Sequence, residues 1–138
     1  MDEALTRFGK RFGVAFQVAD DILDLVGTDG QSGKPQGRDL AERKWTLPLI
    51  RAFECAEPSV RSQLTEILAG ERVSRQDVLT VRELAEAAGA IDYAWGRAEE
   101  WLRSAREQLD AVPESSAREA LLAMAGERFP MPVMSGLP

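Results

Sequence analysis

The chain has 138 residues, of which 44% are hydrophobic and 29% charged, and its formal net charge is −6. An acidic chain lacks the basic face that a nucleic-acid backbone requires, and no apolar run is long enough for a transmembrane helix, so we expect neither nucleic-acid binding nor a membrane span. The acidic first residues predict a cytoplasmic protein, and the absence of histidine excludes histidine-ligated zinc and a Ser-His-Asp triad within this chain.

Helical periodicity runs along the sequence, whereas runs of β-branched and aromatic residues are nearly missing. This pattern predicts an all-α fold. The polar segment 27–37, which contains four glycines and a proline, is predicted to be a loop between the first two helices. The predicted helices span about residues 3–27, 39–56, 58–69, 75–88, 90–111 and 116–128.

The first predicted helix carries three acids on one narrow sector. Apolar side chains occupy well over half of the circumference of residues 9–26, which predicts a buried helix. Asp20, Asp21 and Asp24 share the remaining sector, with Gln17 one turn before them. Buried carboxylates must be protonated, paired or bound to a cation, and three of them favour a hard divalent cation such as Mg²⁺. The alternative is a solvated acidic face on a surface helix.

Basic residues follow this acidic helix closely. Lys34 lies in the glycine-rich loop, and Arg38, Arg43 and Lys44 come at its end and in the first turns of the next helix. Cations that close on acids would simply form salt bridges unless a further negative group is present. A Mg²⁺-diphosphate supplies that group, because the metal bridges carboxylate and phosphate while lysines neutralise the outer oxygens. The alternative is that Lys34 and Arg38 are ordinary exposed loop charges.

The later helices carry signals of structure rather than of chemistry. The one cysteine, Cys55, can form no internal disulfide, and its apolar neighbours on a predicted helix favour a small buried side chain. Ser74 with Asp77, and Ser116 with Glu119, have the spacing of a capping box, in which each side chain binds a backbone N–H at a helix N-terminus.

Three segments resemble the trans-isoprenyl diphosphate (polyprenyl) synthase family. Residues 13–24, GVAFQVADDILD, are similar to its second aspartate-rich motif, in which Phe-Gln precedes DDxxD. Residues 33–40, GKPQGRDL, resemble its GKxxGxDL segment, and residues 43–48, RKWTLP, resemble GKxTLP with Arg43 in place of the usual glycine. The order and spacing of the three segments make the resemblance specific, and it extends over nearly the whole chain.

The resemblance implies the C-terminal helices of an isoprenoid synthase helical bundle over residues 1–128. The prolines that follow cannot continue a helix, and they predict a flexible tail over residues 129–138. The resemblance also implies a prenyltransferase that uses Mg²⁺ to condense an allylic diphosphate with isopentenyl diphosphate. The implied roles are metal binding and catalysis for Asp20, Asp21 and Asp24, diphosphate binding and catalysis for Lys34 and Lys44, and substrate contacts for Phe16 and Gln17.

The similarity covers only the C-terminal half of the family, and no second DDxx(x)D motif occurs in the 138 residues. We therefore expect the isolated chain to be inactive. We also expect it to form a homodimer or to need a partner chain that supplies the first aspartate-rich motif. Apolar flanks on residues 12–26 and 47–56 favour such association. The alternative is a non-catalytic regulatory subunit or remnant that binds a synthase or self-associates.

Overall fold

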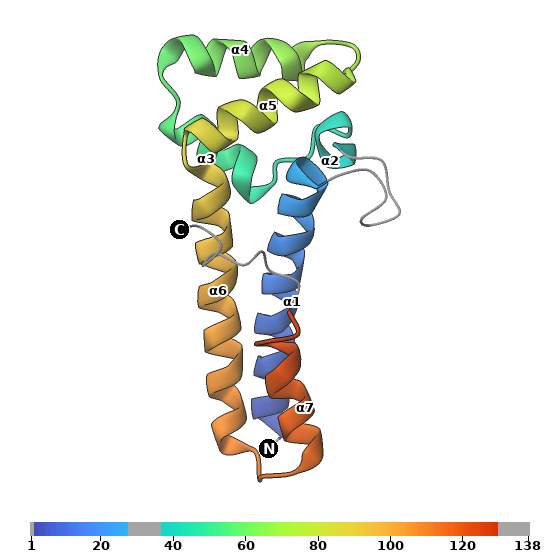
Figure 1. Cartoon of the computed structure of the whole chain (residues 1–138), viewed down its shortest axis with the longest axis vertical. Coiled ribbons are helices and arrows are strands. Elements are labelled where there is room, and N and C mark those ends of the chain that lie inside the picture. The colour runs from blue at the N-terminus through green and yellow to red at the C-terminus, as the bar shows by residue number, and fades with distance from the viewer. Residues whose placement is uncertain (1, 28–36, 130–138) are drawn as a thin grey trace. The chain divides into compact units, whose positions relative to one another are not determined.

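The computed structural model describes residues 2–27 and 37–129. Every regular element in these two ranges is helical, which confirms the predicted all-α fold (Figure 1). In chain order the elements are α1 (Asp2–Val26), α2 (Arg38–Ala41), α3 (Leu47–Cys55), α4 (Pro58–Ala69), α5 (Arg75–Ala87), α6 (Ala90–Gln108), the 3-10 helix η1 (Leu109–Ala111) and α7 (Ser116–Met124).

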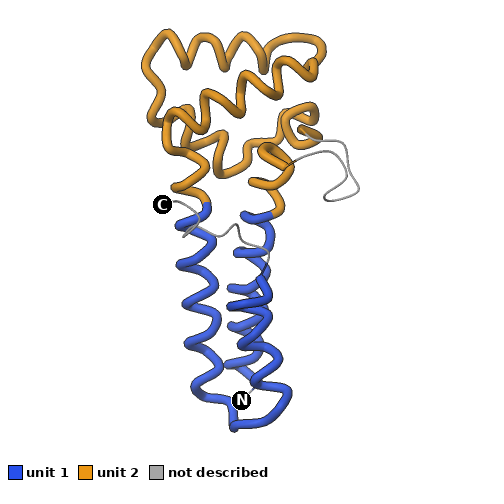
Figure 2. The backbone as a smooth tube through the Cα atoms, in the orientation of Figure 1, with its two compact units in different colours: residues 1–19, 95–138 blue, residues 20–94 orange. Residues whose placement is uncertain are grey.

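The described residues fall into two compact units, which Figure 2 shows in different colours. Unit 1 contains residues 1–19 and 95–138, and unit 2 contains residues 20–94. Helices α1 and α6 therefore each contribute one segment to each unit. The domain boundaries predicted from the sequence, between 1–128 and 129–138, stay a prediction.

Unit 1 consists of the first part of α1, the last part of α6, η1 and α7. Arg7 Nε donates a hydrogen bond of 2.8 Å to Gln108 Oε1, which links α1 to the end of α6. The ring of Phe12 packs edge-on against that of Phe129, with centroids 5.8 Å apart. Phe129 is buried and belongs to the core of unit 1, whereas residues 130–138 of the predicted tail lie outside the described residues.

Unit 2 is held together by a core of aliphatic side chains from α1 to α6. Leu64 of α4 and Val81 of α5 are almost inaccessible to solvent. Burial of each side chain of this size contributes about 1.5–3 kcal/mol to stability. These contacts therefore hold in place the helices that surround the candidate site. The buried members of this core are Leu25, Leu40, Leu49, Ala52, Leu64, Val78, Val81, Ala85 and Ala90.

Helix α1 is buried along one side only. Ala15 and Ile22 are inaccessible to solvent, whereas Val14 is 39% exposed and Phe16 is 52% exposed. The prediction of a helix buried around most of its circumference is therefore wrong for this part of α1. The reason is that the described residues pack against one face of the helix and leave these two apolar side chains in solvent.

The helix predicted over residues 39–56 is wrong, because the structure divides it into α2 and α3. Arg43 adopts a left-handed conformation, with φ of 60°, in the turn between them. Thr46 is extended and Pro48 lies in the first turn of α3, the one place in a helix where a missing backbone N–H costs nothing. Cys55 ends α3 and is exposed, so the expected burial of its side chain is also wrong.

The helix starts follow the sequence signals to within one residue. The capping box of Ser74 and Asp77 is confirmed, because both reciprocal hydrogen bonds form at the start of α5. At α7 the predicted cap is wrong by one position. Ser115, not Ser116, is extended, and its Oγ accepts the N–H of Arg118 at 3.1 Å.

The longest helix, α1, has 25 residues, but acidic and basic side chains interrupt its apolar positions. Within residues 2–27 and 37–129, no helix combines the length and the apolar character needed to cross a membrane. The predicted cytoplasmic location stays a prediction.

Candidate functional site

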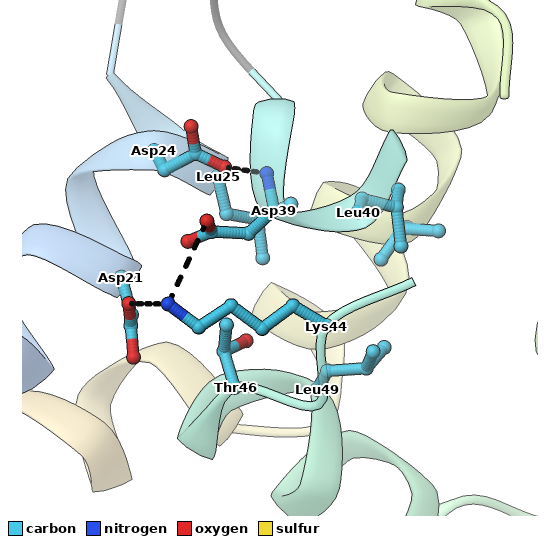
Figure 3. A pocket seen from close by; sticks show the side chains of 9 residues that line it. Asp21, Asp24, Leu25, Asp39, Leu40, Lys44, Thr46 and Leu49 are labelled. Carbon is cyan, nitrogen blue, oxygen red and sulfur yellow. Dashed lines mark hydrogen bonds and ion pairs between the residues drawn. The ribbon is translucent and has the colours of Figure 1, made fainter. Parts of the chain in front are cut away.

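Unit 2 contains a small pocket formed by the end of α1, by α2, and by the turn and first residues of α3 (Figure 3). One side of it is polar, with three carboxylates and one ammonium group. The other side is mostly aliphatic and belongs to the core of the unit. The lining residues are Asp21, Asp24, Leu25, Asp39, Leu40, Lys44, Thr46, Leu49 and Val81.

Lys44 reaches from the turn before α3 to two carboxylates on different helices. Its Nζ lies 3.7 Å from Asp21 Oδ1 on α1 and 3.9 Å from Asp39 Oδ1 on α2 (Figure 3). The two aspartate side chains are 11% and 18% exposed, whereas that of Lys44 is 49% exposed. The ammonium group is thus placed between two largely buried acids and remains accessible from solvent.

Asp24 has a different environment, because its carboxylate binds the backbone. Its Oδ1 accepts the N–H of Arg38 at 3.2 Å, and its Oδ2 accepts the N–H of Asp39 at 3.0 Å. Its own carbonyl oxygen accepts the N–H of Gly37 at 2.8 Å. These three bonds attach the chain segment that follows the loop to the last turn of α1. They also provide acceptors for N–H groups at the start of α2, which have no partner within their own helix.

The pKa of Asp24 is raised above its ordinary value. The main cause is desolvation by burial, which disfavours the charged carboxylate. The negative charges of Asp39 and Asp20 raise the pKa further, whereas the backbone N–H groups of Asp39 and Arg38 oppose the change. Protonation of Asp24 is therefore easier than that of a carboxyl group in water.

Gly37 permits the close approach between the returning chain and the core. Its φ is +81°, a conformation that side chains with a Cβ rarely adopt. A Cβ added at this position would lie 2.5 Å from Cγ2 of Val78 on α5. The backbone conformation thus favours glycine at this position, and the packing of α5 gives a second reason for glycine there.

The motif residues of this pocket lie within the part of the chain that a known family matches. The polyprenyl synthetase family profile matches residues 1–85. The chain belongs to the polyprenyl synthetase family. The resemblance found in residues 13–24, 33–40 and 43–48 is thereby confirmed.

Similar proteins extend the match beyond residue 85. The chain is 40% identical over 122 residues to a short chain isoprenyl diphosphate synthase of Methanothermobacter thermautotrophicus, with 88% of this chain and 37% of that protein covered. It superposes on a geranylgeranyl pyrophosphate synthetase of Pyrococcus horikoshii with a TM-score of 0.81 and 32% identity, over 94% of this chain and 39% of that one. The chain thus spans somewhat over a third of the length of these relatives.

A second similar structure holds ligands. It is the geranylgeranyl pyrophosphate synthase of Corynebacterium glutamicum complexed with isoprenyl diphosphate and magnesium, which has a TM-score of 0.80 and 30% identity. The match covers 89% of this chain and 35% of that one. These neighbours confirm that the helices of this chain have the isoprenoid synthase fold predicted from the motifs.

The structure brings together three of the residues that the family resemblance selected, namely Asp21, Asp24 and Lys44. Asp20 is half-buried on α1, one turn before Asp24, and does not line the pocket. The side chains predicted to contact substrate, Phe16 and Gln17, are exposed and precede these acids on α1, and Lys34 lies outside the described residues. The roles predicted for all seven residues stay predictions.

Two residues of this polyprenyl synthetase pocket were assigned no role from the sequence. Asp39 provides a second acid for Lys44, and Thr46 is a largely buried polar residue that lines the same pocket. Both occur in the motif segments GKPQGRDL and RKWTLP, so a signal was present. Their positions depend on the turn between α2 and α3, which a continuous helix over 39–56 would not produce.

The donor set fits a metal that is shared with a phosphate better than a metal held by protein alone. No group of three or more acidic or cysteine side chains in residues 2–27 and 37–129 is placed to hold a metal ion. Mg²⁺ usually takes only one or two carboxylates, completing its octahedral shell with water and substrate phosphate. Asp21 is a carboxylate of this kind that lines the pocket, next to Lys44, whose ammonium group could neutralise phosphate (Figure 3).

Proposed function

We propose that this chain forms the Mg²⁺-diphosphate-binding part of a trans-isoprenyl diphosphate synthase. The complete enzyme condenses an allylic diphosphate with isopentenyl diphosphate. The observation that supports this most directly is the placement of Lys44 Nζ between Asp21 and Asp39, inside two motif segments of the family. An ammonium group between two acids can also bind the oxygens of a metal-bound anion that shares the site.

Lys44 is proposed to bind diphosphate oxygens. Its long, half-exposed side chain can turn from the aspartates toward an anion in solvent, because neither contact is shorter than 3.7 Å. Bound Mg²⁺ would act as a Lewis acid that stabilises the charge developing on the leaving diphosphate. Asp20 and Asp21 are proposed to hold the metal, and Lys34 to bind the same anion as Lys44.

Asp24 is proposed to support the metal site indirectly, without binding the metal itself. Its two carboxylate oxygens already accept the N–H groups of Arg38 and Asp39, so it keeps α2 against α1 and orients Asp39. Phe16 is proposed to contact the hydrocarbon part of the substrate, with Gln17 on the same wall. The 52% exposure of the Phe16 side chain agrees with a surface that another molecule or polypeptide covers.

The chain is proposed to be inactive alone, because its 138 residues contain a single DDxxD motif. A partner chain that contains the first aspartate-rich motif would complete the site, and self-association into a homodimer is proposed as well. Exposed apolar side chains on α1 and α3, such as Val14 and Ile50, favour such association. The same exposed surface also supports the second candidate, a non-catalytic subunit that binds a synthase.

Calorimetric titration with inorganic pyrophosphate, in the presence and absence of Mg²⁺, tests the binding proposal. We expect Mg²⁺-dependent binding that weakens about tenfold in Lys44→Met, a change worth about 1.4 kcal/mol. Lys10→Met is the matched control, since it removes the same charge from an exposed lysine that does not line the pocket. Equal affinity in the wild-type chain and Lys44→Met would contradict the proposed role.

Incubation with Mg²⁺, dimethylallyl diphosphate and isopentenyl diphosphate separates the two candidate functions. Elongated product formed only after addition of a polypeptide that contains the first aspartate-rich motif would support a catalytic part. Elongated product from the isolated chain would contradict its proposed inactivity. An added polypeptide that binds this chain and makes product equally well with Asp20→Asn/Asp21→Asn would favour the non-catalytic subunit.

A further inference from the structure

The turn between α2 and α3 contains an arginine in an unfavourable backbone conformation. Arg43 has φ of 60° and is the one residue other than glycine with positive φ in residues 2–27 and 37–129. Its position corresponds to a glycine in the family segment that it resembles. A Cβ in this conformation approaches the following carbonyl group, so an arginine here is strained unless its side chain gains something in return.

The side chain of Arg43 makes three hydrogen bonds to backbone carbonyls. Its Nε donates to Leu68 O at 3.0 Å, one Nη donates to Ala41 O at 2.7 Å, and the other donates to Gly70 O. Leu68 and Gly70 lie at the C-terminal end of α4, where carbonyl groups have no helical partner and the helix dipole favours a cation. The guanidinium group thus connects the turn to a helix that is 25 residues further along the chain.

The same turn fixes the backbone position of Lys44. The N–H of Arg43 donates to Leu40 O at 3.0 Å, and the N–H of Lys44 donates to Asp39 O at 2.9 Å. The Lys44 side chain leaves this closed turn toward Asp21 and Asp39. A rotation of the backbone at position 43 would therefore displace the ammonium group.

We propose that Arg43 is a positioning residue for Lys44. Its guanidinium group anchors the turn to the end of α4 and thereby holds the Lys44 ammonium at the two carboxylates. Glycine would adopt the same φ without strain but would leave the turn attached only through its own backbone. The consequence for pyrophosphate binding depends on the proposed function of the site, whereas the anchoring itself does not.

Substitution by glycine separates the side chain from the backbone conformation. Arg43→Gly keeps the left-handed turn accessible and removes only the anchor, whereas Arg43→Lys keeps one donor and the charge. We expect the affinity for inorganic pyrophosphate with Mg²⁺ to fall about fivefold to tenfold in Arg43→Gly and to recover in part in Arg43→Lys. In the Lys44→Met background, Arg43→Gly should cause no further loss, because Arg43 acts through Lys44.

Arg61→Ala is the matched control. Arg61 is another arginine of unit 2 that donates from Nη2 to a carbonyl near a helix end, Phe53 O at 3.0 Å, and this carbonyl belongs to α3 rather than to α4. Its loss should leave pyrophosphate affinity unchanged. Wild-type affinity in Arg43→Gly, or an equal further loss in the Lys44→Met background, would overturn the proposal.

Amide hydrogen exchange provides a readout that does not need the ligand. In Arg43→Gly we expect faster exchange in residues 40–47 and at the end of α4, with little change in the core of α5. If the wild-type chain bound no pyrophosphate, the proposed function would fail while this exchange experiment would still test the anchor. Unchanged exchange over residues 40–47 would overturn the positioning role.

Discussion

Asp24 Oδ2 accepts the backbone N–H of Asp39 at 3.0 Å, so the third acid of the aspartate motif holds the backbone of another acid of the pocket. This contact divides the motif into two kinds of residue. Asp21 faces Lys44 at the pocket, whereas Asp24 is occupied by backbone donors. The spacing of the motif therefore serves the local fold as well as a metal site.

The stability of the chain should respond differently to loss of these two acids. Asp24→Ala leaves the N–H groups of Arg38 and Asp39 without their acceptor, and we expect it to lower the free energy of unfolding by about 1–3 kcal/mol. Asp21→Ala removes a contact to the half-exposed Lys44, worth about 0–1 kcal/mol. Urea unfolding measures both. A greater loss for Asp21→Ala would contradict the structural role of Asp24.

The raised pKa of Asp24 predicts a pH dependence with a definite sign. The folded state binds more protons than the unfolded state between the ordinary pKa of 3.8 and the raised one. The stability contributed by Asp24 is thus fully present below pH 3.8 and is lost as the pH rises through the raised pKa. In Asp24→Asn this loss is absent, so the free energy of unfolding of the wild-type chain should fall relative to that of the variant as the pH rises.

Urea unfolding of both proteins between about pH 3 and about pH 7, without divalent metal, measures this difference. The difference between the two proteins cancels the titration of those carboxylates that do not interact with Asp24. A wild-type advantage that grows with pH would show that the backbone hydrogen bonds to the Asp24 carboxylate outweigh its desolvation, and would contradict the prediction.

Gly37→Ala should destabilise the chain. Alanine would have to adopt a φ of +81°, and its Cβ would lie 2.5 Å from Val78 Cγ2. We expect a loss of about 1–3 kcal/mol, measured as the free energy of unfolding. Val78→Ala in the same chain should recover only the part that is due to the clash. Gly96→Ala is the control, because this helical glycine has no atom within 4 Å of an added Cβ and the change should be neutral or stabilising.

The core of unit 2 should depend on Leu64. This side chain of α4 is inaccessible to solvent, so Leu64→Ala is expected to lower the free energy of unfolding by about 2–5 kcal/mol through lost burial and a cavity. Leu79→Ala, at a 38% exposed position of α5, should cost much less. Similar losses for the two variants would mean that α4 does not pack as described.

The positions of most helices and the family motifs could be predicted from the sequence, whereas the interruption between α2 and α3 was not predicted. Hydrophobic periodicity identified α4 with its observed bounds and placed the ends of most other helices within a few residues. The break between α2 and α3 was missed although Pro48 marks it, because periodicity alone continues across the turn. The choice between Ser115 and Ser116 as the cap of α7 depends on which serine is extended, and that is a property of the preceding chain.

The sequence predicted that acidic and basic residues form the site, but not which acid contacts Lys44 and which binds backbone N–H groups. Asp21 and Lys44 meet as the spacing of acids and bases suggested. That Asp24 would bind backbone, and that Asp39 would share Lys44, follows only from the placement of α2 against α1. No periodicity carries that information, because the contact spans a loop and depends on the turn at Gly37.

Association of the chain should depend on Phe16. Its side chain is 52% exposed on α1, and burial of apolar surface is the main source of free energy for association. We expect sedimentation velocity to show self-association of the chain, and Phe16→Ser to weaken it about tenfold, as loss of a buried aromatic contact would. Leu79→Ser removes an exposed apolar residue from α5 and should leave the association unchanged. A wild-type chain that sediments as a monomer at all concentrations would contradict self-association, and an equal effect of both substitutions would assign it to general hydrophobicity rather than to this face of α1.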